Sequence, residues 1–586
     1  MLNFKLKTNA IDSSTNTPLE DYLNTLGITS TDQFIGTPSK VFELDGRCLD
    51  NALRMVDILH DCFEANKKFF LVVDCDTDGF TSSAIFYNYF KSIYPHSTID
   101  WMLHEEKQHG IELDKIPADA EVIIVPDAGS NQVKEVSELL SQGKIVLIMD
   151  HHQVEGVMPV HPGVCLVNNQ VSDNFYNKAL SGAGVVFKIV QLYDKTYRDS
   201  MVASTALYDL AALGIIADCM DSRTLDNNYI IRRGLREIIN PMFKALLNKQ
   251  NYSVSSTEQP TKMDISFYIA PLINGTIRMG TMEDKELLFR GFIELNHTEY
   301  YEHSWRGSTN MESFYARSAR IAFNVKNEQN RMKLKCLEFL QKRVEEQKLN
   351  DNKIIAVITY DDDEVPVPKT ITGLVAMELL KTYGKPALVL RPTIGADGIL
   401  AYAGSGRSNS YEELPSFLAF VRDQEESVYA QGHSCAFGAS IKADEFDNFI
   451  EACNSKMEHI DFANDTNYVD VHFKNFINRR VIDEFARGAH IYGNQIPEPI
   501  IAIEATISRS DIRIMGKEAS SISVTIGNIP CVKFKDAKLA EKLRDVNRAK
   551  VTIIGKAALN NYNGAVSSQL KIIDMDVEKI SGGGLF

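Results

Sequence analysis

The sequence has no apolar segment long enough to cross a membrane. None of its 586 residues lies in an uninterrupted apolar stretch of about 18 residues, the length that a membrane helix needs. The first residues, Met1 to Lys5, also contain no apolar core of a signal peptide. We therefore expect neither membrane attachment nor secretion.

Paired cysteines are absent as well. The nine cysteines are scattered and include no Cys-x-x-Cys pair. An odd, dispersed set argues against a disulfide framework and against a zinc ribbon. We therefore expect the protein to work in a reducing cytoplasm.

Positive charge is scarce except in one region. The formal net charge is −16, but residues 471–571 hold 16 Lys and Arg against 9 Asp and Glu. A basic module on an acidic body can bind a phosphate backbone locally, whereas ordinary surface variation is the alternative explanation.

Three apolar runs in the first 150 residues end on polar side chains. Continuous β-rich runs of this length are typical of buried parallel strands. Ligands of an open α/β sheet bind outside the carboxyl ends of such strands. The runs cover residues 69–73, 122–126 and 145–149, and they lead into Asp74, Asp127 and Asp150-His151-His152, respectively.

The first of these runs leads into alternating aspartates. Asp74, Asp76 and Asp78 lie two residues apart, so on an extended segment Asp76 and Asp78 share a face. Gly79 then permits a tight turn into the next helix. The alternative is a turn with helix-capping aspartates. Asp218 is expected at the end of a buried helix over residues 203–217.

These side chains predict a cation site. Carboxylate oxygens with one or two imidazoles favour Mn²⁺ or Mg²⁺, and the absence of thiolates disfavours Zn²⁺. Carboxylates at this density need neutralising charge. His151 and His152 alone would be compatible with ordinary loop histidines, but their occurrence beside three strand ends favours a metal centre.

The same segments resemble the motifs of the DHH phosphoesterases. These segments are residues 73–82, 126–129, 150–152 and 209–218. Within that family, further segments resemble the RecJ branch of single-strand-specific exonucleases. They are residues 180–188, 271–279, 405–408, 432–433 and 492–499, which occur in the family's order.

The resemblance implies a dinuclear metal site. Asp127 and Asp218 would be bridging carboxylates, Asp74 would support the site, and Asp150 would orient a histidine. The catalytic side chains would be Asp74, Asp150 and His151. The implied metal ligands are Asp76, Asp78, Asp127, Asp218 and one or both of His151 and His152. Two divalent cations are expected, with Mn²⁺ preferred and Mg²⁺ as the alternative.

Some segments depart from the family pattern. The RecJ pattern carries an arginine after the second strand, where this chain has residues 104–111, and Lys107 is the nearest candidate for a phosphate contact. The double glycine before His433 is here Gln431-Gly432, and the Ala-Ala-Gly-Arg segment is here residues 275–278. These changes indicate a divergent member, with altered recognition of the DNA end.

Arginines are the strongest candidates for holding DNA. Arg278 and Arg407 can bind phosphate oxygens bidentately. Ser405 and Ser408 place hydroxyls beside Arg407, although an ordinary surface loop is the alternative. The complete set of expected phosphate or DNA contacts is Lys107, Asn274, Arg278, Ser405, Arg407, Ser408 and His433.

The expected fold is α/β with an added barrel. A parallel-sheet DHH domain is followed by a long connecting helix, a second α/β domain of the DHHA1 type and an OB-like β-barrel. The helix is predicted from a Pro-free and Gly-free apolar stripe over residues 314–347. The expected segments are a lead-in (1–60), the catalytic domain (61–313), the helix (314–349), the second domain (350–465), the barrel (470–575) and a tail (576–586).

These features predict a 5′→3′ exonuclease of single-stranded DNA that acts by two-metal hydrolysis and releases 5′-mononucleotides. Polarity and the preference for DNA over RNA follow from the resemblance alone. One alternative is a phosphodiesterase of short oligonucleotides or cyclic dinucleotides, which would not need the barrel. Another is a non-catalytic strand-binding module. We expect a monomer, and the tail Gly582 to Phe586 is either a docking peptide for a replication partner or a plain chain end.

Overall fold

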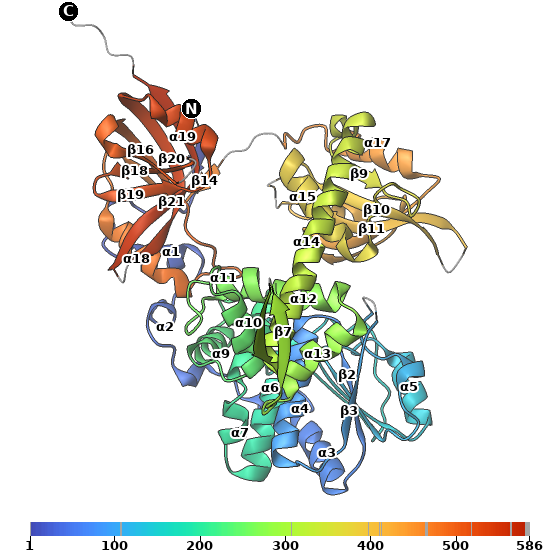
Figure 1. Cartoon of the computed structure of the whole chain (residues 1–586). Helices are drawn as coiled ribbons and strands as arrows, with labels where there is room; N and C mark the ends of the chain where they lie inside the picture. The colour runs from blue at the N-terminus through green and yellow to red at the C-terminus, as the bar shows by residue number, and fades with distance from the viewer. Residues whose placement is uncertain are drawn as a thin grey trace, which may run out of the picture. The chain divides into compact units, whose positions relative to one another are not determined.

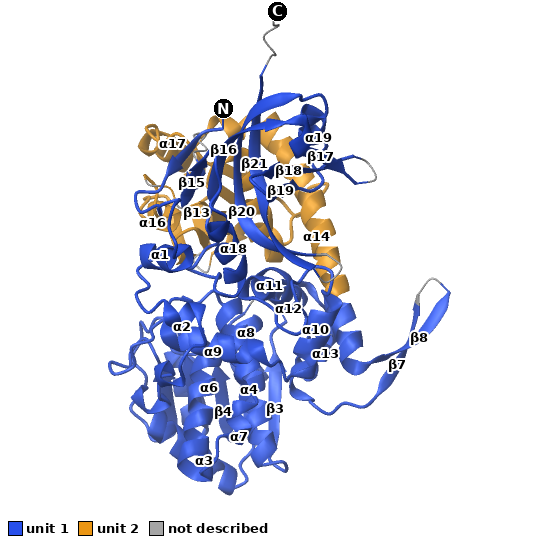
Figure 2. Cartoon of the chain, turned by 90° about the vertical axis from the view of Figure 1, so that its left-hand side faces the viewer, with its two compact units in different colours: residues 1–322, 466–586 blue, residues 323–465 orange. Residues whose placement is uncertain are grey.

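The chain forms two compact units, which Figure 2 distinguishes by colour. One unit comprises residues 1–322 together with 466–586, and the other comprises residues 323–465. The computed structural model describes residues 2–105, 108–305, 307–395, 398–409, 411, 413–462, 467–516, 519–562 and 565–580. No helix within these ranges has both the length and the hydropathy that crossing a bilayer requires.

The first unit contains the expected parallel sheet. Its five strands have the order β3-β2-β4-β5-β6, and every pairing is parallel. All residues of β2 and β4 are buried, which explains why their sequences are apolar throughout rather than alternating. The strands are β2 (Phe69–Val73), β3 (Ile99–Leu103), β4 (Val122–Pro126), β5 (Ile145–Asp150) and β6 (Val164–Asn168).

Helices cover both faces of this sheet. On one face α4 (Thr77–Ile93), α6 (Gly182–Tyr193) and α8 (Tyr208–Ala217) pack against one another. On the opposite face, α5 (Val133–Ser141) packs on the sheet (Figure 1). Helix α8 is buried nearly throughout, which agrees with its uninterrupted apolar sequence. The carboxyl ends of β2, β4 and β5 lie at one edge of the sheet. The amino end of α6 and the carboxyl end of α8 lie beside them.

The second unit is also α/β. The long helix predicted over residues 314–347 is present as α14 (Phe314–Glu346) and leads into it. The sheet has the order β12-β13-β11-β10-β9, in which only the β9–β10 pairing is parallel. Its elements include β9 (Ile355–Ile358), α15 (Thr372–Tyr383), β10 (Ala387–Ile394), β11 (Leu400–Arg407), β12 (Ser427–His433) and β13 (Ala436–Lys442).

The carboxyl-terminal part of the first unit, where the barrel was predicted, is a seven-stranded β-sheet with a helix, α18 (Arg479–Arg487), packed against it. Its strand order is β15-β16-β20-β21-β19-β18-β17. The strands are β15 (Val471–Lys474), β16 (Ile501–Ser508), β17 (Ile512–Met515), β18 (Ser521–Ile526), β19 (Ile529–Lys533), β20 (Arg548–Tyr562) and β21 (Ala565–Lys579).

The lead-in completes this barrel rather than standing alone. Strand β1 (Phe4–Leu6) pairs with β14 (Asn467–Val469), and helix α1 (Pro18–Thr25) packs against α18. Tyr22 is fully buried in the barrel core, and its hydroxyl donates to the Pro497 carbonyl at 2.8 Å. The sequence could not reveal this arrangement, because the partners lie more than 400 residues apart.

Candidate metal centre

Asp76 and Asp78 shape the start of α4. Asp76 is the N-cap of the helix, and its carboxylate accepts hydrogen bonds from the backbone N–H groups of Asp78 (2.9 Å) and Gly79 (3.1 Å). The expectation that the two aspartates alternate on an extended segment is wrong for Asp78, because the helix already begins at Thr77. The capping interpretation is correct for Asp76, and it leaves Asp78 in the first helical turn.

Gly79 is needed for a close approach and not for a turn. It lies within the helix, and a Cβ atom built on it would stand 2.6 Å from both the Cβ and the carbonyl oxygen of Asp74. Any side chain at this position would push α4 away from the end of β2. The glycine thus holds the first aspartates of the motif close together.

The start of α6 holds Asp78. Its carboxylate accepts hydrogen bonds from Ser181 Oγ (2.9 Å) and from the backbone N–H groups of Gly182 (2.7 Å) and Ala183 (3.1 Å). A helix N-terminus stabilises negative charge through its free N–H groups. A Cβ at Gly214 would lie 2.4 Å from Asp78 Oδ1, so glycine also permits α8 to approach.

Asp127 brings to the site a buried oxygen, Oδ1, that accepts no hydrogen bond from the described residues. It follows β4 in a left-handed conformation (φ 62°) and is 2% exposed. Burial, with the charges of Asp78 and Asp76, raises the pKa of Asp127 well above its usual range. A buried carboxylate of this kind requires a positive partner.

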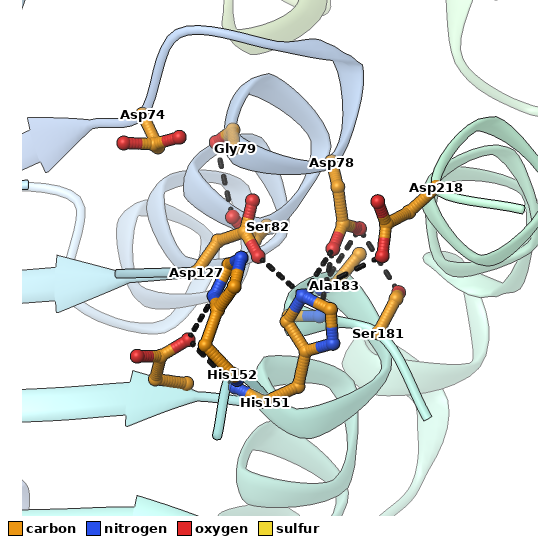
Figure 3. A network of polar contacts seen from close by, with 12 residues as sticks. Asp74, Asp78, Gly79, Ser82, Asp127, His151, His152, Ser181, Ala183 and Asp218 are labelled. Carbon is orange, nitrogen blue, oxygen red and sulfur yellow. Dashed lines mark hydrogen bonds and ion pairs between the residues drawn. The ribbon is translucent and has the colours of Figure 1, made fainter. Parts of the chain in front are cut away.

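His151 bridges the carboxylates. Its Nε2 atom lies 3.2 Å from Asp127 Oδ1, 3.5 Å from Asp218 Oδ2 and 3.9 Å from Asp78 Oδ2 (Figure 3). Burial lowers the pKa of His151 and favours the neutral imidazole, which is the form that ligates metals. The side chain therefore points a ligand atom into the middle of the acidic cluster.

Asp150 orients the second histidine. It accepts hydrogen bonds from His152 Nδ1 (2.8 Å) and from the backbone N–H of His151 (2.7 Å). Burial alone would raise the pKa of Asp150, but His152 holds it well below its usual range. The same hydrogen bond raises the pKa of His152 to about 9. The His152 side chain is 57% exposed, so it lies at the rim of the cluster.

Asp218 adds a further carboxylate to the cluster. Asp218 ends α8, where burial and the charges of Asp78 and Asp76 raise its pKa to about 8. Two sets of side chains each bring possible ligand atoms within 4.8 Å of one another. The contact between His151 and Asp127 connects the two sets. The sets are Asp78, His151 and Asp218, and Asp74, Asp76 and Asp127. Oxygen donors with one imidazole fit Mn²⁺ or Mg²⁺.

His109 is a site residue that the sequence interpretation missed. Its Nδ1 atom lies 2.7 Å from Asp74 Oδ2, and the backbone N–H of Gly110 donates to Asp74 Oδ1 at 3.0 Å. The hydrogen bonds with Asp74 and Cys75 raise the pKa of His109 to about 10. A cation thus stands in the segment where the family pattern has an arginine. The signal is a histidine inside residues 104–111, but the prediction named Lys107.

We expect His109→Gln to weaken metal binding about tenfold. Side chains that hydrogen-bond to the groups around a metal contribute tenfold or more to metal affinity. The measurement is Mn²⁺ titration of the purified protein. His96→Gln, which removes an exposed histidine from the same domain, is the matched control. Equal Mn²⁺ affinity of the two variants would remove His109 from the site.

Without metal, the protein should lose stability as pH rises from about 6.5 to 8.5. A carboxyl whose folded pKa is raised contributes stability below its unfolded value, about 3.9, and loses it as pH passes the folded pKa. For Asp218 that value is about 8. His109 and His152 act in the same direction, since their pKa values are also raised.

Melting temperature in EDTA, measured against pH, checks this expectation. Asp218→Asn isolates the aspartate, because it should flatten the curve while leaving the histidine contribution in place. Addition of Mn²⁺ at pH 8 should restore the wild-type melting temperature. A wild-type curve in EDTA that rises over this interval would contradict the assignment of raised carboxyl pKa values.

Two further candidates lie near the acidic cluster. Asn274, on α12 (Ala270–Met279), accepts hydrogen bonds from the Thr77 backbone N–H (3.0 Å) and hydroxyl (2.9 Å). This places its oxygen at the start of α4 rather than free for a phosphate. Burial and the charges of Asp74 and Asp78 raise the pKa of Asp76, and the charge of Arg278, on the same helix as Asn274, offsets a small part of that rise. The Nε atom of Arg278 is buried without a partner among the described residues, and Lys107 lies outside them.

The remaining candidates lie together in the second unit. Ser405 and Arg407 are two residues apart on β11, and Ser405 Oγ is 2.9 Å from the hydroxyl of Thr372 at the start of α15. A Cβ at Gly373 would lie 2.4 Å from the Arg407 guanidinium. Arg407 and His433 both pair with Ala436, from opposite sides of β13.

Ser408 follows the end of β11. Its backbone N–H donates to the Cys435 carbonyl at 3.0 Å, and its hydroxyl donates to the Asn409 carbonyl at 2.7 Å. Its hydroxyl is thus already engaged within the loop. The structure therefore places Ser405 and Arg407 at the start of α15, whereas Ser408 and His433 contact the beginning of β13 and the loop before it.

Family models match both ends of the chain. The model described as DHH family, N-terminal domain, matches residues 68–215. The model described as RecJ OB domain matches residues 472–574. The first match contains Asp74 to Asp78, Asp127 and the two histidines, and it ends three residues before Asp218.

Curated relatives cover most of the chain. YorK of Bacillus subtilis (strain 168), a protein of the SPbeta prophage named as a candidate single-strand DNA-specific exonuclease, is 32% identical over 536 residues. That alignment covers 90% of this chain and 91% of YorK. The single-stranded-DNA-specific exonuclease RecJ of Dickeya dadantii (strain 3937) is 24% identical over 69% of each chain.

Solved structures share the fold over nearly the whole chain. RecJ from Thermus thermophilus in complex with Mn²⁺ superposes with a TM-score of 0.69 at 17% identity, covering 97% of this chain and 78% of the other. The Mg²⁺ complex of RecJ from the same organism gives a TM-score of 0.64 at 16% identity, covering 100% and 80%. The fold predicted from the sequence is thus confirmed.

Proposed function

This chain belongs to the RecJ-like branch of the DHH family, and from that premise we propose that it is a metal-dependent exonuclease of single-stranded DNA. We further propose that it acts from the 5′ end by two-metal hydrolysis and releases 5′-mononucleotides. The relatives named above are single-strand-specific exonucleases, which supports the substrate class. RNA is the less favoured substrate, and the protein would act as a monomer in the cytoplasm.

The observation that carries this proposal is the buried Oδ1 of Asp127, which accepts no hydrogen bond from the described residues and lies 3.2 Å from His151 Nε2. Asp127 and Asp218 would be shared by two cations, and Mn²⁺ would be preferred, with Mg²⁺ as the alternative. When bound, such cations activate water and stabilise charge on phosphoryl oxygens. The protein's task is to fix the ligands, which the N-terminus of α6 does for Asp78.

Supporting residues set the orientation of the ligands. Asp150 accepts a hydrogen bond from His152 Nδ1, which fixes the orientation of the ring. Asp74 has both oxygens occupied, by His109 and by the Gly110 N–H, which suits a supporting role. One carboxylate oxygen of Asp76 caps α4, and the other oxygen would bind a cation. Arg278 would neutralise a phosphate beside it.

The cluster around the start of α15 would hold a phosphate of the strand. Helix N-termini and arginine both favour phosphate oxygens. Ser405 and Thr372 bring hydroxyl groups to the same place as Arg407. We propose that this cluster in the second unit binds phosphate during recognition of the strand, with His433 from the neighbouring strand.

The barrel would bind the strand as OB-folds do. Part of its basic surplus is already paired, however. Arg479 and Arg480 lie on α18 and form ion pairs with Asp483 (3.4 Å) and Glu484 (2.7 Å). Lys533 donates to the Ile573 carbonyl at 2.5 Å. Fewer basic side chains of the barrel are therefore available to bind the strand than the number of lysines and arginines suggests.

Digestion of one oligonucleotide labelled at either end tests the polarity and the product. With Mn²⁺, a 5′ label should appear at once as a mononucleotide, whereas a 3′ label should remain on slowly shortening strands. Early release of the 3′ label would reverse the proposed polarity. Preference for a dinucleotide would favour the small-substrate alternative, and strand retention without cleavage would favour the non-catalytic one.

The proposed docking tail, residues 581–586, lies outside the described residues. We keep it as a proposal, and deletion of this segment followed by pull-down of a single-strand-binding protein tests it. Loss of capture would support docking, whereas unchanged capture would identify the segment as a plain chain end.

A further inference from the structure

The first unit also contains a pocket, separate from the metal centre, that is lined by basic residues. Its volume is about 800 Å³, within the range of small-molecule sites. The walls come from residues 35–40, from α9 (Leu225–Arg236) and from the segment leading into α11 (Lys262–Asp264); both helices are labelled in Figure 1. His490, between α18 and β16, lines the pocket as well. None of the metal-site residues described above lines it.

The lining has positive groups and no negative ones. Among the lining residues there is no aspartate or glutamate, although acidic residues outnumber basic ones in the chain as a whole. The six basic side chains are Lys40, Arg232, Arg233, Arg236, Lys262 and His490. A pocket that excludes carboxylates from an acidic protein favours an anionic occupant.

Lys262 is the innermost of these groups. It is 2% exposed, and its Nζ atom has no hydrogen-bond partner among the described residues. Burial, together with the charge of Arg232, lowers the pKa of Lys262 to about 7. The nearest carboxylate along the chain, Asp264, instead accepts hydrogen bonds from the backbone N–H groups of Ser255 (2.9 Å) and Thr261 (2.8 Å). No carboxylate among the described residues therefore pairs with the Lys262 ammonium group.

Arg232 and His490 complete an inner trio. Arg232 donates to the Phe34 carbonyl, and burial lowers its pKa. His490 places Nδ1 3.2 Å from the Arg487 carbonyl, while its Nε2 is buried without a partner in the described ranges. Lys262 is buried, and Arg232 and His490 beside it are half-buried; burial and the charge of Arg232 lower the pKa of His490. An anion among these groups would offset the repulsion between their charged forms and lower the free energy of the folded state.

We propose that this pocket binds a phosphate group, carried either by a free mononucleotide or by the backbone of a single strand. Lysine and arginine together provide the charge and the directed N–H donors that phosphate oxygens accept. This site is distinct from the metal centre and from the cluster around Arg407. Its binding of small anions does not depend on the proposed nuclease activity.

The pocket also adjoins the loop that follows a metal ligand. The stem of Lys262 packs against Gly493, where a Cβ would lie 3.1 Å from Lys262 Cδ and Cε. Asn494, the next residue, donates from its side chain to the Cys219 carbonyl, directly after Asp218. Gly493 and Asn494 would therefore connect a phosphate bound at Lys262 with the loop after Asp218.

Binding measurements in EDTA test the proposal without metal chemistry. The probes are inorganic phosphate, thymidine 5′-monophosphate, thymidine, and an oligothymidylate without a 5′-phosphate, each titrated calorimetrically. The variants are Lys262→Met and Arg232→Gln. The matched control is Lys244→Met, which removes an exposed lysine of α10 (Pro241–Lys249) outside the pocket.

The wild type and Lys244→Met should bind a phosphate-bearing probe at least about tenfold more tightly than the two pocket variants, since hydrogen bonds between charged groups are lost. Loss for phosphate and the mononucleotide identifies a free nucleotide as the occupant; loss for the oligonucleotide alone identifies a strand. Thymidine should not bind. Lys262→Met should melt no lower than the wild type, because it removes an unbalanced charge. Equal affinities of all variants for every probe would overturn the proposal.

Discussion

Asp127→Ala should lower nuclease turnover by about a thousandfold or more. Asp127 belongs to one ligand set and contacts His151 of the other. As the proposed bridging carboxylate, it would donate to both cations, so its removal would weaken both. Metal ions contribute several kcal/mol of stabilisation to a phosphoryl transition state, and about 4 kcal/mol corresponds to a thousandfold in rate. Steady-state release of mononucleotides in Mn²⁺ measures the loss.

Stability separates this effect from misfolding. In EDTA, Asp127→Ala should melt at or above the wild-type temperature, because it removes a carboxyl group whose ionised form burial and the charges of Asp78 and Asp76 disfavour. The rise in melting temperature on adding Mn²⁺ should shrink. Asp221→Asn, which lies three residues beyond Asp218 and pairs with Arg223, is the control and should keep full turnover. Wild-type turnover in Asp127→Ala would disprove the metal assignment.

Arg407→Gln should lower kcat/KM for long single strands by about a hundredfold, equivalent to about 2.7 kcal/mol. The guanidinium lies against Gly373 at the start of α15, where a strand phosphate could meet both its N–H groups and the helix N-terminus. The loss should be larger on strands that carry a 5′-phosphate if this cluster reads the end. Rates on matched substrates with and without that phosphate make the comparison.

Two variants of the same unit serve as controls. Arg391→Gln removes an arginine of β10 that is ion-paired with Asp361, and it should cost little activity. Arg407→Lys keeps the charge but not the planar fork, so it should recover only part of the loss. If Arg407→Gln and Arg391→Gln have equal kcat/KM, the cluster around α15 does not bind the strand.

The sequence revealed the sheet and its acidic edge for a simple physical reason. Strands that are buried on both faces must be apolar throughout, so β2, β4 and β5 stand out as short continuous runs. Polar side chains at their ends then mark the place where parallel strands bind ligands. Asp127, Asp150 and His151 were predicted together on this basis, and the structure places them together.

Other features depend on contacts that no local pattern records. Asp78 was assigned to an extended segment, because spacing alone does not show that Asp76 caps a helix. His109 becomes part of the site only through the fold that brings it to Asp74. The lead-in belongs to the barrel through pairing across more than 400 residues. The pocket around Lys262 likewise joins four distant segments.

The central claim is that this metal centre removes nucleotides from the end of a single strand. Incubation of linear and covalently circular single-stranded DNA of the same sequence with Mn²⁺ tests it most directly. We expect the linear strand to be degraded to mononucleotides, the circle to stay intact, and EDTA or Asp127→Ala to stop the reaction. Cleavage of the circle, or degradation of the linear strand by the Asp127→Ala variant, would contradict it.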